Sequence, residues 1–194
     1  MVVDDLHHLD AADWIPSPHF DERPYNRHPE LVVLHCVSLP EGQFGTGNPQ
    51  ALFQGRLDID AHPSFHDLAG LEVSPHLLIT RDGDLQQFVT FDQRAWHAGA
   101  SSWRHRPRCN DFAIGIELEG AVNVPFDLAQ YDSLARVLLA LFVKYPALSI
   151  DAVVGHNEIA PGRKDDPGRF FDWKGLYLGL HRRMLPQLSA NELR

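Results

Sequence analysis

The sequence predicts an α/β or α+β fold in which helices flank one central mixed β-sheet. Three features support this prediction: an Asp-Gly hairpin signal between two apolar runs, a strictly alternating strand at 112–119, and an amphipathic helix at 127–145. The hairpin supplies an antiparallel pair of strands, and the other strands are separated by helices. This combination favours a mixed sheet. The sequence has no internal repeat and no linker, so we expect residues 1–194 to form a single domain with its core at about 16–185.

The first half of the chain contains three expected strands and one short helix. A polar, Pro-rich entry loop at 17–30 leads into LVVLH, an apolar run that fits a buried strand over 31–35 and ends at His35. A candidate helix covers 50–56. The runs SPHLLIT and LQQFVTF flank RDGD, where Asp-Gly between alternating residues predicts a β-hairpin.

The strand at 112–119 places two different kinds of residue on its two faces. The segment DFAIGIELEG alternates with a period of two. One face carries Phe112, Ile114, Ile116 and Leu118, and the other carries Ala113, Gly115, Glu117 and Glu119. Small residues and two acids therefore share the face away from the apolar side.

The second half of the chain alternates between helix and strand. Apolar residues recur at helical spacing from Asp127 to Tyr145, where Asp127 and Gln130 resemble a capping box and Pro146 ends the helix. The run DAVVGH predicts a strand that ends at His156. A last helix is expected from about Trp173 to Met184.

The composition excludes several classes of function. The net charge of −9 with neutral His disfavours nucleic acid and anionic lipid as partners. No segment is apolar enough to insert into a membrane, and the N-terminus does not resemble a secretory signal. Cys36 and Cys109 form no CxxC pair and are expected to be thiols in a reducing compartment. The 12 histidines raise the expectation of a metal site.

Two histidines stand where short apolar strands are expected to stop. His35 and His156 are far apart in sequence but can meet at one edge of a sheet, and Asp166 follows in a turn before Pro167. A His-His-Asp set offers Zn²⁺ three ligands at about 2.0–2.2 Å and leaves a fourth position open, as in catalytic sites. The pattern therefore favours zinc-assisted hydrolysis of an amide or ester.

The remaining polar groups allow both functional and structural interpretations. Glu117 could act as general base, although the pattern does not distinguish it from Glu119 on the same face. Lys164 could stabilise an oxyanion, or it could form a solvated surface pair with Arg163. A single His at a strand end is more often structural than a ligand, and an Asp before Pro is more often a turn residue.

A series of motifs in fixed order gives a more specific indication. They are PSPHF, LHCVSLPEGQFG, DAHPSF, VSPHLLI, RDG, RAWHAG, RCNDF, IGIELEG and GHNEIAPGRKDDPG followed by FDW. Together they resemble the AmpD family of cytoplasmic zinc N-acetylmuramoyl-L-alanine amidases, which act on anhydro-muropeptides during cell-wall recycling. The resemblance extends from about Pro16 to Trp173. It implies the amidase-2 fold, shared with peptidoglycan recognition proteins and phage amidases.

The resemblance also implies residue roles. His35, His156 and Asp166 would bind one zinc ion per chain, Glu117 would be the catalytic acid and base, and Lys164 would stabilise the transition state. The implied substrate carries an amide between N-acetylmuramic acid, preferably in its 1,6-anhydro form, and L-alanine of the stem peptide. No obligate protein partner is inferred. The substrate-binding candidates implied by the motifs are Trp96, His97 and Arg108.

The sequence departs from the family pattern at three positions. Cys36 stands where relatives commonly have Asn, Glu72 where they can carry Arg, and Asp165 where Thr is more usual. None is a proposed ligand, so we expect catalysis to be retained and specificity to be less certain. The alternatives are a peptidoglycan-binding module without activity and a lytic amidase that acts on intact cell wall.

Overall fold

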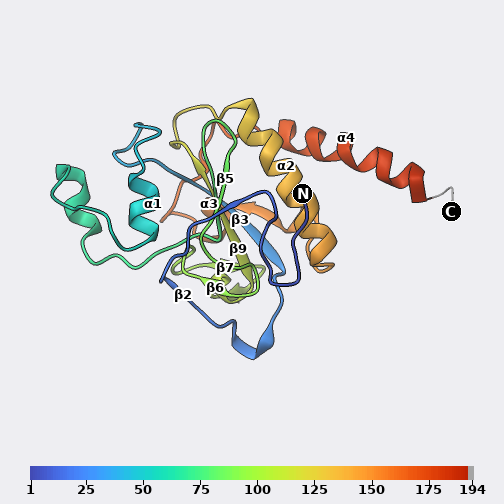
Figure 1. The fold of residues 1–194 in the computed structure, drawn as a ribbon, viewed down its shortest axis with the longest axis horizontal. Coiled ribbons are helices and arrows are strands. Elements are labelled where there is room, and N and C mark those ends of the chain that lie inside the picture. The colour runs from blue at the N-terminus through green and yellow to red at the C-terminus, as the bar shows by residue number, and fades with distance from the viewer. Residues whose placement is uncertain (192–194) are drawn as a thin grey trace.

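A six-stranded mixed sheet forms the centre of the molecule. The computed structural model describes residues 1–191. The strand order in the sheet is β1-β5-β4-β9-β3-β10. Figure 1 shows β3, β5 and β9 near the middle of the molecule. The strands are β1 (Asp13–Trp14), β3 (Leu31–Val37), β4 (Leu77–Ile79), β5 (Leu85–Gln87), β9 (Ala113–Glu119) and β10 (Val153–Gly155).

The sheet combines parallel and antiparallel pairs, as the sequence predicted. Strands β10, β3, β9 and β4 pair in parallel, whereas β4 and β5 form the antiparallel hairpin expected around Asp82-Gly83. The hairpin strands are shorter than the apolar runs that flank the turn. The N–H groups of Phe88 and Val89 both point to the carbonyl oxygen of His76, which ends the regular ladder.

Two small sheets and eight helical segments complete the described residues. Strand β2 (Phe20–Asp21) pairs with β6 (Arg94–Ala95), and β7 (Ser102–Trp103) pairs with β8 (Arg106–Pro107). The α-helices are α1 (Asn48–Phe53), α2 (Leu128–Lys144), α3 (His156–Ile159) and α4 (Trp173–Asn191). The 3₁₀ helices are η1 (Pro24–Asn26), η2 (Pro63–Leu68), η3 (Cys109–Asp111) and η4 (Ile150–Ala152).

Helix α2 covers one face of the sheet and makes the main core. Its buried side chains include Leu134, Leu138 and Leu141, which belong to the same hydrophobic cluster as Ile114 and Ile116 of β9. The expected capping box begins this helix, with the side chain of Gln130 accepting the Asp127 N–H at 3.1 Å. Figure 1 shows α2 beside the sheet with α4 running outward from it.

The opposite face of the sheet is also covered, so residues on both faces of β9 are buried. Ala113 and Gly115 are buried together with Ile114 and Ile116, because loops and α3 pack on the second face. Strands β3, β9 and β10 point the same way, so their C-terminal ends meet at one edge. In α/β sheets this edge is where ligand sites form.

Several element boundaries differ from the sequence prediction. Helix α1 covers Asn48–Phe53, where 50–56 was expected. Strand β3 does not end at His35 but continues to Val37, because Cys36 and Val37 still pair with β9. Strand β10 ends at Gly155, and His156 is the first residue of α3. Helix α4 continues past Met184 to Asn191. None of the described helices is long and apolar enough to cross a membrane.

Candidate metal centre and active site

The sheet register places the two candidate histidine ligands side by side. His35 lies in β3 directly opposite Glu117 of β9. On its other side, Gly155 of β10 pairs with Leu34 of β3, so the next residue, His156, begins α3 beside His35. The carboxylate of Glu158 accepts the Gly155 N–H at 2.8 Å, which stabilises the turn from strand to helix. Parallel strand pairing therefore joins residues that are 121 positions apart.

Asp166 completes a cluster of three ligand atoms. The loop that carries it returns to α3, where the Asn157 N–H donates to the Asp166 carbonyl oxygen at 3.0 Å. Nδ1 of His35 lies 2.9 Å from Nδ1 of His156, and Oδ2 of Asp166 lies 3.1 and 3.0 Å from these two nitrogens. The three residues form a group that could hold a metal ion.

The surroundings of this cluster fit a bound cation. Nε2 of His156 lies 3.1 Å from the carbonyl oxygen of Ala98 and 3.3 Å from Nη2 of Arg163. With its hydrogen on Nε2, directed at the carbonyl oxygen, the ring presents the lone pair of Nδ1 to the cluster. Burial lowers the pKa of His35 to about 4 and favours its neutral, metal-binding form. Burial acts to raise the pKa of Asp166, but the adjacent His156 and His35 imidazoles outweigh it and hold that pKa below its usual range. Two imidazoles and one carboxylate match the ligand set of a catalytic zinc site.

Glu117 and Glu119, which the sequence pattern left equivalent, occupy different environments. Glu119 is a structural residue whose carboxylate accepts N–H groups from Gly45 at 2.5 Å and Arg81 at 3.1 Å. Glu117 instead lines the cavity beside the cluster, and its buried Oε2 has no partner among the described residues. Burial and the charge of Asp166 raise the pKa of Glu117 well above its usual range, while Lys164 acts to lower it. A buried carboxyl with a raised pKa suits proton transfer near neutral pH.

A cavity of about 410 Å³ opens over the cluster. Lys164 and Trp96 line it together with His97, so the structure brings these three predicted residues to the site. The apolar part of the lining includes Leu39, Leu52, Phe53, Leu68, Leu71 and Val73. Of the two substituted positions next to ligands, Asp165 is exposed and Cys36 is half-buried, and both belong to the lining. Burial raises the pKa of the Cys36 thiol, which keeps it protonated.

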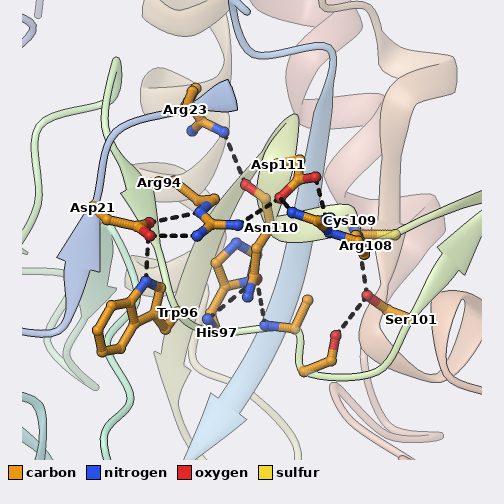
Figure 2. Close-up of polar contacts among 12 residues, drawn as sticks. Asp21, Arg23, Arg94, Trp96, His97, Ser101, Arg108, Cys109, Asn110 and Asp111 are labelled. Carbon is orange, nitrogen blue, oxygen red and sulfur yellow. Dashed lines mark hydrogen bonds and ion pairs between the residues drawn. The ribbon is translucent and has the colours of Figure 1, made fainter. Parts of the chain in front are cut away.

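The third substrate-binding candidate lies elsewhere. Arg108 is exposed and pairs with Asp111, with 3.1 Å between Nε and Oδ2, and it is not among the described residues that line the cavity. Trp96 is held in place by its Nε1–H, which donates to Asp21 at 3.1 Å, and Arg94 bridges Asp21 and Asp111 (Figure 2). Trp96 is thus anchored by a hydrogen bond at one end while it lines the cavity.

The sequence interpretation missed several residues around the histidines. Arg163 is exposed, like Lys164, but its guanidinium also donates to the carbonyl oxygens of Ala98 at 2.7 Å and Ala100 at 2.8 Å, contacts that the sequence interpretation did not include. Asn110 accepts two backbone N–H groups beside the site, and no pattern in its motif pointed to that role. Such contacts depend on loop conformation, which local sequence does not encode.

Comparison with known proteins gives the family. A family model described as N-acetylmuramoyl-L-alanine amidase matches residues 25–169. The chain belongs to this amidase family. The amidase is 54% identical over 165 residues to the 1,6-anhydro-N-acetylmuramyl-L-alanine amidase AmpD of Salmonella typhimurium (strain SL1344). The matched residues cover 85% of the chain and 88% of the relative.

Solved structures agree with this membership. The amidase superposes on a crystal structure of a selenomethionine AmpD derivative with a TM-score of 0.90 and 49% identity, over 93% of the chain and 99% of that structure. The amidase AmiD from E. coli, solved as a complex with anhydro-N-acetylmuramic acid-L-Ala-D-gamma-Glu-L-Lys, matches with a TM-score of 0.57 and 30% identity. That match covers 78% of the chain and 57% of AmiD. The predicted resemblance and the predicted fold class are confirmed.

Proposed function

We propose that the amidase hydrolyses the amide between 1,6-anhydro-N-acetylmuramic acid and the L-alanine of a stem peptide, using one Zn²⁺ per chain. The observation that carries this proposal is the convergence of His35 Nδ1, His156 Nδ1 and Asp166 Oδ2 next to Glu117, whose buried Oε2 has no partner among residues 1–191. The sequence identity of 54% to an AmpD enzyme that is named for this reaction supports the proposed substrate. The bound anhydro-muropeptide in E. coli AmiD supports the same class of ligand.

The roles of the chain's own residues follow from their placement. Zinc held by His35, His156 and Asp166 would supply Lewis-acid activation of water and of the scissile carbonyl group. Glu117 takes a proton from the attacking water and delivers it to the departing amine nitrogen. The ammonium of Lys164, in the cavity lining, stabilises the negative charge that develops on the carbonyl oxygen. The products are a lactyl carboxylate on the sugar and a free peptide amine.

Substrate contacts are assigned to the cavity lining. The indole of Trp96 and the imidazole of His97 lie in the lining and would contact the muropeptide. Arg108 remains a candidate for binding a stem-peptide carboxylate, because a guanidinium can bind such a group with two hydrogen bonds. Its present pairing with Asp111 means that it would have to change partner.

We further place this reaction in cytoplasmic cell-wall recycling by a chain that acts as one domain. The family resemblance supports this placement, and the free thiols of Cys36 and Cys109 are compatible with it. The test compares cleavage of soluble anhydro-muramyl-tripeptide with cleavage of intact sacculi. Recycling requires preference for the soluble substrate, and preference for sacculi would indicate a lytic amidase. Binding of muropeptide without cleavage at full zinc occupancy would indicate a receptor.

A further inference from the structure

Two consecutive residues contact the outer nitrogens of both candidate histidine ligands. Nδ1 of His97 lies 2.9 Å from Nε2 of His35, and the carbonyl oxygen of Ala98 lies 3.1 Å from Nε2 of His156. The two imidazoles that point inward at the cluster are thus both held from outside by the segment 97–98.

The hydrogens on these nitrogens can be assigned by donor and acceptor rules. Nε2 of His156 lies between an acceptor, the Ala98 carbonyl oxygen, and a donor, Nη2 of Arg163 at 3.3 Å. Metal coordination through Nδ1 requires the hydrogen on Nε2, where the carbonyl oxygen can accept it. Metal coordination through Nδ1 of His35 likewise requires that its hydrogen sit on Nε2. Nδ1 of His97 must then accept this hydrogen bond, which places the hydrogen of the neutral His97 ring on its own Nε2. The opposite tautomer of His97 would donate to His35 and place a hydrogen on the nitrogen that faces the cluster.

We propose that His97 is a positioning residue that holds His35 in the tautomer able to bind the metal. This role rests on the proposed zinc site and goes beyond a contact with substrate. His97 Nε2 is buried, has no partner among the described residues, and belongs to a side chain that lines the cavity. In the assigned tautomer this atom is a hydrogen-bond donor that no acceptor among the described residues satisfies.

The fold fixes the His97 ring through its backbone and through the strand beneath it. Asn110 Oδ1 accepts the N–H groups of His97 at 3.3 Å and Ala98 at 2.8 Å, and Arg23 donates to the Asn110 carbonyl oxygen at 3.1 Å (Figure 2). The ring lies over Gly115 of β9, where a Cβ atom would stand 2.3 Å from Cγ of His97. Gly115 therefore leaves the space that the ring needs, a reason for its place in the alternating strand.

The first test is zinc affinity, measured by competition with a chelator for the purified full-length protein. His97→Phe keeps a flat ring over Gly115 but removes the acceptor for His35. Loss of such an outer partner typically weakens metal affinity about 10–100-fold. His181→Phe is the matched control, because His181 is exposed on α4, and it should bind zinc like the wild type. A His97→Phe protein that binds zinc as tightly as the wild type would overturn the proposal.

Two further measurements keep the test decisive if His97→Phe does not fold. In the zinc-loaded wild type, two-bond ¹H–¹⁵N NMR should find the hydrogen of His97 on Nε2, and a hydrogen on Nδ1 would refute the assignment. Asn110→Asp keeps the side-chain oxygen that accepts both N–H groups, whereas Asn110→Leu removes it. Zinc affinity should fall in Asn110→Leu and be rescued in Asn110→Asp, and equal affinities would contradict the part assigned to Asn110. A wild type without zinc affinity would instead reject the proposed function itself.

Discussion

Glu117 should make the metal-free amidase less stable as the pH rises. The Oε2 atom of its carboxyl is buried without a partner in the part of the chain that the structure describes, and burial raises the pKa of Glu117 well above the ordinary 4.5 that applies to an unfolded chain. Between these two values the folded state holds a proton that the unfolded state has lost. Stability is therefore fully present below pH 4.5 and declines as the pH rises toward the folded pKa. Glu117→Gln removes this titration.

The size of the effect follows from proton linkage. One proton changes the free energy of unfolding by up to about 1.4 kcal/mol per pH unit. In a chain of this length, 1 kcal/mol moves the melting temperature by about 2–4 °C. The melting temperature of Glu117→Gln minus that of the wild type should thus increase by up to about 3–6 °C per pH unit between pH 4.5 and the folded-state pKa of Glu117.

The assay is thermal unfolding followed by circular dichroism, with chelator present, from about pH 5 to pH 8. The histidines and Asp166 are common to both proteins, so their titration largely cancels in the difference. Glu41→Gln, which removes an exposed carboxylate, is the matched control, and its difference from the wild type should not grow with pH. A flat difference for Glu117→Gln, or a variant less stable than the wild type near pH 8, would refute the reasoning.

Four further substitutions give separate expectations. Gly115→Ala should drive its new Cβ into His97, destabilise the protein by about 1–3 kcal/mol and weaken zinc binding, as checked by melting temperature and chelator competition; wild-type values would contradict this. Lys164→Ala should lower kcat about 100-fold at unchanged zinc content, and an unaltered kcat would remove the role of Lys164. Glu119→Ala should cost about 1–3 kcal/mol in chemical denaturation while zinc stays bound, because two N–H groups lose their acceptor; zinc loss would argue against a purely structural role. Arg108→Ala should raise KM for anhydro-muramyl-tripeptide about fivefold with kcat unchanged, and an unchanged KM would eliminate Arg108 as a carboxylate contact.

The sequence predicted those parts of the amidase that depend on periodicity and on short-range signals. Alternation located β9, helical spacing and a capping box located α2, and Asp-Gly located the β4–β5 hairpin. His35 and His156 were found because each follows a short apolar run. The end of β3 was misplaced because pairing with β9, and not local composition, extends it to Val37.

The finer features of the site depend on tertiary contacts that no local pattern encodes. Glu117 and Glu119 share a face in the sequence, and only the packing of Gly45 and Arg81 around Glu119 separates their roles. His97 was expected only to line the groove, because its contact with His35 joins residues 62 positions apart. The hydrogen bonds of Arg163 were not predicted, because the carbonyl oxygens that accept them lie in a distant loop.

The central claim is that His35, His156 and Asp166 bind a zinc ion required for amide hydrolysis. It is tested most directly by mass spectrometry of anhydro-muramyl-tripeptide incubated with the purified protein after chelation and again after one equivalent of zinc is restored. The account predicts that free tripeptide is absent after chelation, appears when zinc returns, and is not released by Asp166→Ala at the same zinc concentration. Tripeptide release by the chelated protein, or undiminished release by Asp166→Ala, would contradict it.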